Sequence, residues 1–299
     1  MIADVLILVG PANAAYGINS YIADTANSIG LTAETHVIGD PLADWMTGDY
    51  TTWFTNNFDQ VWILADERVL STYSPFSDFI TSAQMMARYG KSVLIAGEWS
   101  LYSEENNNLN YDVSEFVAEM TDSYPAYFYG ADSTEGYYQE FEANPNAIGN
   151  LTKCVKTVAF NESGSFDLNP PGSPPVIPYG WNDENILVRN AVNQPMIAAW
   201  ETVGNPLAYP YGGRLIVTLD QDIFDPVAQQ SWPRDINKRL TQNFLNWLSF
   251  RNIPPCTAFP LRLNQRDDNL GLSPTARVLY TSQSRQNNNS ARIDGGLYL

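Results

Sequence analysis

The sequence predicts an α/β fold: a doubly wound, mostly parallel sheet with helices on both faces. Three observations predict it: apolar runs without polar alternation, amphipathic segments between these runs, and glycines at the expected helix ends. Unbroken runs of Val, Ile and Leu are typical of strands covered on both faces, which occur in parallel sheets. Their alternation with helices indicates a sandwich of helices around one sheet.

Five apolar runs mark the expected strands. They lie at 3–10, 32–39, 59–66, 91–97 and 213–220. The first run is short and follows Asp4, so we interpret it as a core strand and expect no signal peptide. No segment approaches the roughly 20 apolar residues that span a bilayer, and we expect no transmembrane segment.

Apolar residues recur every three or four positions in the segments that link these strands, which predicts amphipathic helices. The expected helices lie at 18–29, 75–90, 113–120 and 235–251. Gly30 and Gly90 fall where a C-cap glycine would end a helix just before the next strand. The last helix is expected to close the core.

Two regions depart from this alternation. Residues 124–210 are rich in Tyr, Asn, Gly and Pro, with short β-like segments, and we interpret them as an insertion of antiparallel strands and loops at one edge of the sheet. Residues 262–299 are polar with short apolar islands. The predicted organisation is therefore an α/β domain at 1–261 and an extended C-terminal arm at 262–299, which needs a partner to hold it.

Charge is distributed unevenly along the chain. The net charge is −17, and from Arg262 onward five Arg and three Asp give +2, so the preceding residues carry −19. An acidic body repels nucleic acid and anionic membranes, so neither is expected as a partner. A basic arm is suited to docking on a neighbouring copy or another acidic protein.

Cysteine and histidine are scarce. Cys154 and Cys256 lie far apart without His or Cys neighbours at metal-ligand spacing, so we predict two buried thiols and no zinc site. His36 is the single histidine, and its alternating sequence context favours a position on a strand face. A Cys-His or Ser-His mechanism would depend on that residue.

Ligand sites in α/β sheets gather beyond the C-terminal ends of the strands. Those ends are expected to present Gly10, Pro11, Asn13, Asp66, Glu67, Glu98, Ser100, Asp220, Asp222 and Asp225. The carboxylates could bind a divalent cation, act as a general acid and base, or bind sugar hydroxyls beside Trp99. We favour the simpler interpretation that they cap helices and solvate loops, with no metal and no cofactor.

Two further segments give only limited information about function. The loop VGPANAAYG lacks the glycine spacing and the Lys of a phosphate-binding loop, which disfavours a nucleotide cofactor. Tyrosines cluster between Tyr124 and Tyr138, including Tyr127 and Tyr129. This cluster suits a carbohydrate or protein contact surface, or the packing of the insertion, which we favour.

A set of segments carries a family resemblance. VLILVG, FDQVWILAD, the helix end RYG, KSVLIAGEWS, GRLIVTLDQDIFD and NFLNWL together resemble the class I glutamine amidotransferase-like superfamily over residues 3–122 and 213–250. In active members a Gly-x-Cys-x-Gly elbow follows the strand, and a His with an acidic partner comes later. Here Glu98 occupies the approximate nucleophile position and Asp220 or Asp222 the approximate region of the His. The resemblance therefore implies the fold with a degenerate catalytic site.

The C-terminal arm has a second likeness. Polar, Arg-bearing and ending in a short apolar hook, it resembles the arms by which tailed-phage virion proteins clasp their neighbours. Its expected contact residues are Arg262, Arg266, Arg277, Arg285, Arg292, Leu297 and Tyr298. We therefore predict a non-enzymatic virion component, a capsid or tail accessory protein, found in the virion or the cytoplasm of the producing cell.

Two alternatives concern carbohydrate. A glycan hydrolase would use Glu98 with Asp220 or Asp222, whose carboxylates should then lie roughly 5 to 9.5 Å apart across a cleft. A glycan-binding module would instead use Trp99, Ser100, Tyr127 and Tyr129.

Overall fold

The computed structural model describes residues 3–38, 50–64, 76–97, 113, 116, 117, 120, 139–161, 164–166, 168, 181–203, 212–226 and 237–256. The chain divides into two units, Met1–Ile253 and Pro254–Leu299. All the helices and strands below belong to the first unit.

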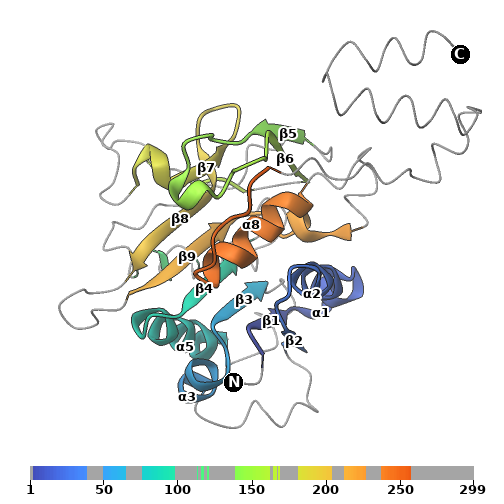
Figure 1. Cartoon of the computed structure of the whole chain (residues 1–299), viewed down its shortest axis with the longest axis vertical. Coiled ribbons are helices and arrows are strands. Elements are labelled where there is room, and N and C mark those ends of the chain that lie inside the picture. Colours follow the sequence, from blue (N-terminus) through green and yellow to red (C-terminus); the bar gives the residue numbers. More distant parts are fainter. Residues whose placement is uncertain are drawn as a thin grey trace, which may run out of the picture. The chain divides into compact units, whose positions relative to one another are not determined.

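A mixed, mostly parallel sheet of seven strands forms the centre of this unit (Figure 1). In spatial order the strands are β2 (Ala33–Val37), β1 (Val5–Val9), β3 (Gln60–Leu64), β4 (Ser92–Ala96), β9 (Gly213–Thr218), β8 (Pro195–Val203) and β7 (Ile186–Arg189). The first five are mutually parallel, β8 pairs antiparallel with β9, and β7 pairs antiparallel with β8. The five predicted runs thus become the five parallel strands, and the α/β class is confirmed.

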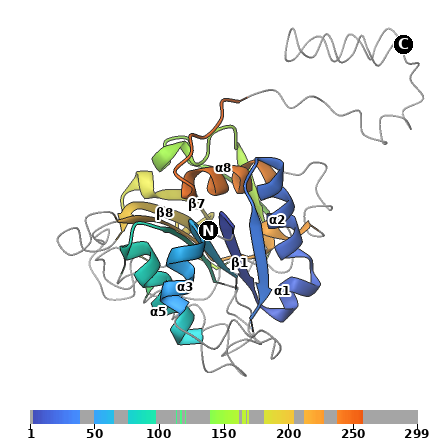
Figure 2. The same cartoon turned by 60° about the horizontal axis from the view of Figure 1, so that its bottom comes forward.

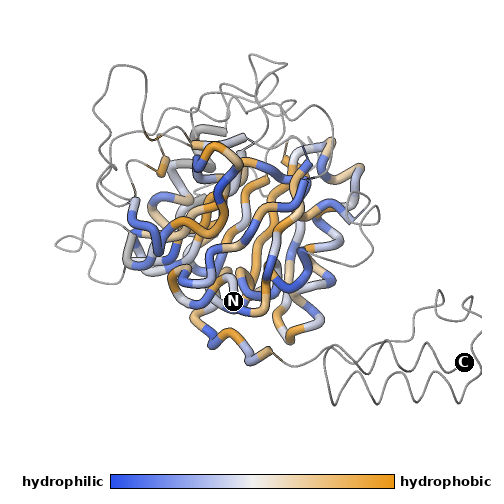
Figure 3. Tube along the Cα trace, turned by 90° about the horizontal axis from the view of Figure 1, so that it is seen from above, coloured by the Kyte–Doolittle hydropathy of each residue, from blue (hydrophilic) through white to orange (hydrophobic). Residues whose placement is uncertain are grey.

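Burial of the strands follows their composition. The segments VLILV, QVWIL and SVLIA of β1, β3 and β4 are buried at every position. Figure 3 shows hydrophobic residues along the strands at the centre of the sheet. The edge strand β2, AETHV, is only partly buried, which fits its three polar residues Glu34, Thr35 and His36. The hydrophobic pattern therefore distinguishes the inner strands from this edge.

Helices cover both faces of the sheet (Figure 2). Helices α2 (Ile18–Ser28) and α8 (Lys238–Leu248) bury their apolar residues on one face, together with Val5, Ile7 and Val9 of β1. Helices α3 (Tyr50–Asn57) and α5 (Phe76–Arg88) pack against the other face, which Leu6 and Leu8 line. Consecutive residues of one strand thus serve two cores, as the period of two requires.

The helix predictions are largely confirmed. Gly30 and Gly90 have φ of 75° and 83°, the left-handed conformation of a glycine that ends a helix. The described residues of the 113–120 segment, Val113, Phe116, Val117 and Met120, are helical and buried. Helix α3, of sequence YTTWFTNN, was not predicted because its polar residues and threonines hide the helical period.

Short elements surround these layers. They are α1 (Pro11–Ala15), the antiparallel pair β5 (Gln139–Glu142) and β6 (Thr157–Phe160), and the 3-10 turns η2 (Ile148–Asn150), η3 (Asp183–Asn185) and η4 (Asp222–Phe224). No helix within the described ranges is long and apolar enough to cross a membrane.

Charged side chains hold the N-terminal end of the parallel strands. Lys91 Nζ lies 2.7 Å from Asp59 Oδ1, and Arg214 Nη2 on β9 lies 3.0 Å from Glu201 Oε1 on β8. The Arg214 guanidinium also stacks over the rings of Trp247 and Phe250, at 4.8 and 4.5 Å from their centroids. Burial lowers the pKa of Arg214, and Glu201 opposes this shift. This end of the sheet therefore depends on paired cations.

A close backbone contact lies at the same end. A Cβ added to Gly213, the first residue of β9, would lie 1.6 Å from the carbonyl oxygen of Lys91. No other residue type fits there without a shift of the main chain, so Gly213 permits the close approach of the two backbones.

The prediction of two buried thiols is wrong. Cys154 and Cys256 are both disulfide-bonded, and both are exposed. The prediction relied on the tendency of free cysteine to be buried, which does not apply to an oxidised sulfur. Cys154 lies in a surface turn with a φ of 65°, where bonding rather than packing fixes the side chain.

Candidate functional site

The C-terminal ends of β1, β3, β4 and β9 meet at one edge of the sheet, the usual place for a ligand in this class of fold. Backbone bonds continue the pairing just past the strands. The Gly10 amide donates to Leu64 O at 2.9 Å, and the Gly97 amide donates to Thr218 O at 2.8 Å. The ends of β1 and β3, and those of β4 and β9, are thereby held side by side just beyond the strands.

Asn13 joins three of the turns at this edge. It lies in α1, directly after β1, and is 6% exposed. Its amide Nδ2 donates to Leu64 O at the end of β3, at 2.9 Å, and to Oε1 of Gln221, which follows β9. Gln221 is itself fully buried. The two amides therefore serve the interior of the fold.

The predicted pair Asp220 and Asp222 is brought together around Asn161, the residue after β6. Asp220 Oδ2 accepts from the Asn161 amide at 2.9 Å, and Asp220 Oδ1 accepts from the Asp222 amide at 2.7 Å. Asp222 Oδ2 accepts from Asn161 Nδ2 at 2.7 Å. Both carboxylates thus bind the polypeptide itself and fix the turn that leads into η4.

This geometry limits the chemistry of the two aspartates. The Asp220 side chain is completely buried, and each of its oxygens accepts a backbone N–H. A general acid or base must instead reach the proton of a substrate. The favoured interpretation, a structural role for these carboxylates, agrees with the contacts, although Asp220 is buried rather than solvated.

His36 lies on a strand face, as predicted, and is separated from Asp220 by the width of the parallel sheet. It sits on β2, opposite Leu8, and its Nε2 is 2.6 Å from Glu34 Oε1. Four strand spacings separate β2 from β9, about 19 Å at 4.8 Å each. His36 and Asp220 therefore do not form a catalytic pair.

Most of the other predicted site residues lie outside the described residues. These are Asp66, Glu67, Glu98, Trp99, Ser100, Tyr127, Tyr129, Arg262, Arg266, Arg277, Arg285, Arg292, Leu297 and Tyr298. Within the ranges that the structure describes, no group of three or more His, Cys, Asp or Glu residues is placed to hold a metal ion.

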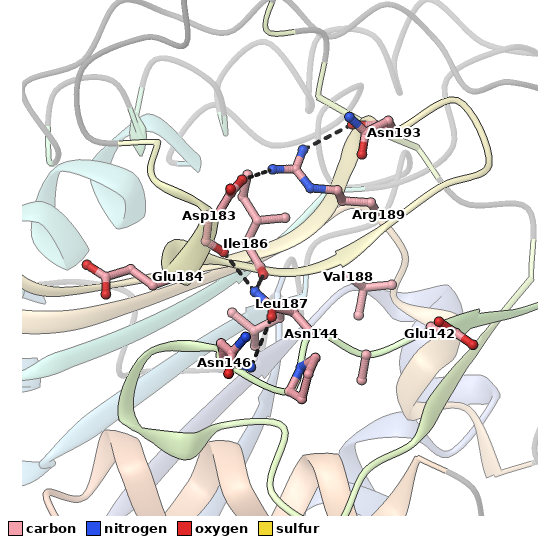
Figure 4. A pocket seen from close by; sticks show the side chains of 12 residues that line it. Glu142, Asn144, Asn146, Asp183, Glu184, Ile186, Leu187, Val188, Arg189 and Asn193 are labelled. Carbon is pink, nitrogen blue, oxygen red and sulfur yellow. Dashed lines mark hydrogen bonds and ion pairs between the residues drawn. The ribbon is translucent and has the colours of Figure 1, made fainter.

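A polar pocket of about 550 Å³ lies beside β7, the outermost strand on the side of the sheet away from β2 (Figure 4). Asn144 forms its floor: Nδ2 donates to Asp183 O and Ile186 O, both at 2.8 Å. Arg189 lies on its wall, with Nη2 2.8 Å from Asp183 Oδ1 and Nη1 donating to Asn193 O at 3.0 Å. Glu142 and Glu184 complete the polar lining.

Sequence reasoning missed this pocket. The segment NDEN at 182–185 forms a capping box in which Asn182 and Asn185 bond reciprocally around η3. That motif was a detectable signal for a turn. The pairing of Asn144 with a turn about 40 residues later was not detectable, because it depends on the tertiary fold.

No family model matches this chain, and a search of curated proteins finds no match either.

Proposed function

We propose that this protein is a non-enzymatic structural or assembly protein, a component of a phage virion that uses an α/β domain as a scaffold. One observation carries the proposal. At the edge of the sheet where an enzyme of this class would present its catalytic groups, Asp220 and Asp222 bind Asn161 and their own turn. The aspartates that the structure describes at this edge thus serve internal bonding.

The proposed scaffold is a catalytically degenerate member of the amidotransferase-like, flavodoxin-like group. The order β2-β1-β3-β4-β9 of the parallel strands supports it, since it corresponds to the 2-1-3-4-5 order of flavodoxin-like sheets. The sequence also supports it, because Glu98 rather than Cys follows the β4 strand and turn.

The proposed attachment to neighbouring subunits is through the arm at 262–299. Charge supports it, since the arm carries +2 and the rest of the chain −19. The oxidised state of Cys154 and Cys256 supports a virion location, because disulfides persist in oxidising settings such as virion surfaces.

Removal of the arm tests this function. We expect the full chain to form a defined oligomer, or to bind particles from which it is missing, and a chain ending at residue 261 to remain folded but monomeric. Light scattering coupled to size exclusion measures the mass, and circular dichroism checks the fold. A full-length variant with the arm arginines changed to Gln should assemble weakly, and the loss should mimic added salt. Normal assembly of the truncated chain contradicts the proposal.

Glycan binding is a second candidate function, favoured by the pocket beside β7. Amide, carboxylate and guanidinium groups line it, and its volume of about 550 Å³ admits a small saccharide. Binding on a glycan array that Arg189→Ala abolishes, and that Arg251→Ala leaves intact, would establish it. No binding by the full chain to any glycan would remove it.

A further inference from the structure

Cys154 occupies an unusual position on the surface. It ends the turn 151–154 between η2 and β6, it is exposed, and its φ of 65° is a left-handed conformation that costs a non-glycine residue about 1–2 kcal/mol. Its sulfur is in the oxidised, disulfide-bonded state. Cys256 is disulfide-bonded and exposed as well, and an exposed disulfide sulfur is open to attack by a thiol.

The turn that carries Cys154 is held in place. Asn243 of α8 is buried, and its Nδ2 donates to Leu151 O at 2.8 Å and to Lys153 O at 2.9 Å. These two bonds fix the backbone immediately before Cys154 against α8. The sulfur therefore has a defined position relative to the first turn of that helix.

One cation, Arg239, lies against this sulfur in an otherwise acidic chain. Arg239, in the first turn of α8, places Nη2 3.7 Å from Cys154 Sγ. Lys153 and Lys156 flank Cys154 in the sequence, and Lys238 precedes Arg239. On the adjacent strand β5, the carboxylate of Glu140 accepts a bond from Thr157 Oγ1 at 2.7 Å. Positive charge near a sulfur stabilises its thiolate form.

We propose that Cys154 is a thiol-exchange site, at which Arg239 stabilises the leaving thiolate. A thiolate of a small thiol attacks the sulfur to which Cys154 is bonded. A new S–S bond forms there, the old one breaks, and its electron pair remains on Cys154 Sγ. A second thiolate then resolves the mixed disulfide, so that two thiolates become one small disulfide and the protein gains two electrons. This inference goes beyond the assembly function and does not depend on it.

The equilibrium with glutathione tests the proposal in the full-length chain. Samples are equilibrated at pH 7 over a range of reduced to oxidised glutathione, quenched with acid, alkylated and weighed by mass spectrometry. Because Arg239 stabilises the reduced form, Arg239→Gln should require about three to five times more reducing conditions at the midpoint. Arg251→Gln, which removes an equal charge beside Gly30, is the control and should leave the midpoint unchanged.

A second measurement uses chains with one cysteine. In Cys256→Ser, the Cys154 thiol should react with iodoacetamide at pH 7 about three to five times faster in the folded chain than in urea. Arg239→Gln should abolish this acceleration. Equal rates in the folded chain and in urea, or a glutathione midpoint that Arg239→Gln and Arg251→Gln leave the same, would overturn the proposal.

Discussion

The two ends of the parallel strands are held in different ways. At the C-terminal end, buried amides and carboxylates bind backbone groups, with Asn13 and Asp220 at the centre. At the N-terminal end, partly exposed cations pair with carboxylates and stack on rings, as Lys91 and Arg214 do. The first kind of bond is short-ranged and shielded from salt, while the second weakens as ionic strength rises.

This difference separates the proposed scaffold from an enzyme of the same architecture. An enzyme places groups at the C-terminal end of the strands that are free to reach a substrate. Among the described residues of that end, Asn13 and Gln221 instead bind each other, although more than 200 residues separate them in the sequence. The end that usually carries function thus stabilises the fold.

The largest expected effect comes from the backbone contact at the N-terminal end. Gly213→Ala would place Cβ 1.6 Å from Lys91 O, so β9 must shift away from β4. We expect a loss of about 4 kcal/mol or more in the free energy of unfolding, measured by urea denaturation. Gly30→Ala is the control: its φ is 75° but nothing lies within 4 Å, so about 1–2 kcal/mol is expected. Equal losses would mean that β4 and β9 do not approach so closely.

The next effect tests the C-terminal end. In Asp220→Asn, an NH₂ group replaces one of the two oxygens that accept backbone N–H groups, and the donor facing it is left without a partner. We expect a loss of about 2–3 kcal/mol in the free energy of unfolding. Asp222→Asn keeps an oxygen for Asn161 Nδ2 and should cost about 1 kcal/mol or less. Neither loss should change between low and high salt. An unaffected stability in Asp220→Asn would show that this carboxylate is not needed for the fold.

Arg214 gives an intermediate effect. Arg214→Met keeps most of the apolar stem but removes the stacking on Trp247 and Phe250 and the pair with Glu201, so about 1–2 kcal/mol should be lost. Glu201→Gln removes the pair alone and should cost about 0.5 kcal/mol. If both variants lose the same amount, the ion pair rather than the stacking is important.

The smallest effect distinguishes the two ends by salt. Asp59→Asn breaks the partly exposed pair with Lys91, and we expect a loss of about 0.5–1 kcal/mol at low salt. At about 0.5 M salt this loss should vanish, because the Debye length falls below the spacing of most surface charges. A loss that persists at high salt would contradict the distinction between the two ends.

The parallel core could be predicted because each of its strands is recognisable from its own residues. Runs such as VLILV and SVLIA are almost entirely apolar, and both are buried at every position. The order of the strands is less local: β9 pairs with β4 although more than a hundred residues separate them. No pattern within either strand specifies that partner.

The site was predictable only in part. Strand ends identified Asn13, Asp220 and Asp222 as neighbours, because carboxyl ends of parallel strands meet. Their partners Asn161 and Gln221 were not identified, since a hydrogen bond between residues far apart in the sequence has no local signature. The oxidised state of Cys154 was missed for the same reason, because it depends on proximity in the folded chain.

The pairing of β4 with β9 has a consequence for biosynthesis. When Ala96 has been made, 116 further residues (97–212) must be added before Gly213 begins the strand that covers this edge. At about 5–20 residues per second, that takes roughly 6–23 s. During this interval the apolar segment SVLIA has an open edge in a nascent chain that is already able to pair β1, β2 and β3. The interval between the synthesis of β4 and that of β9 is therefore the stage of translation at which this protein is most exposed to aggregation and most dependent on chaperones.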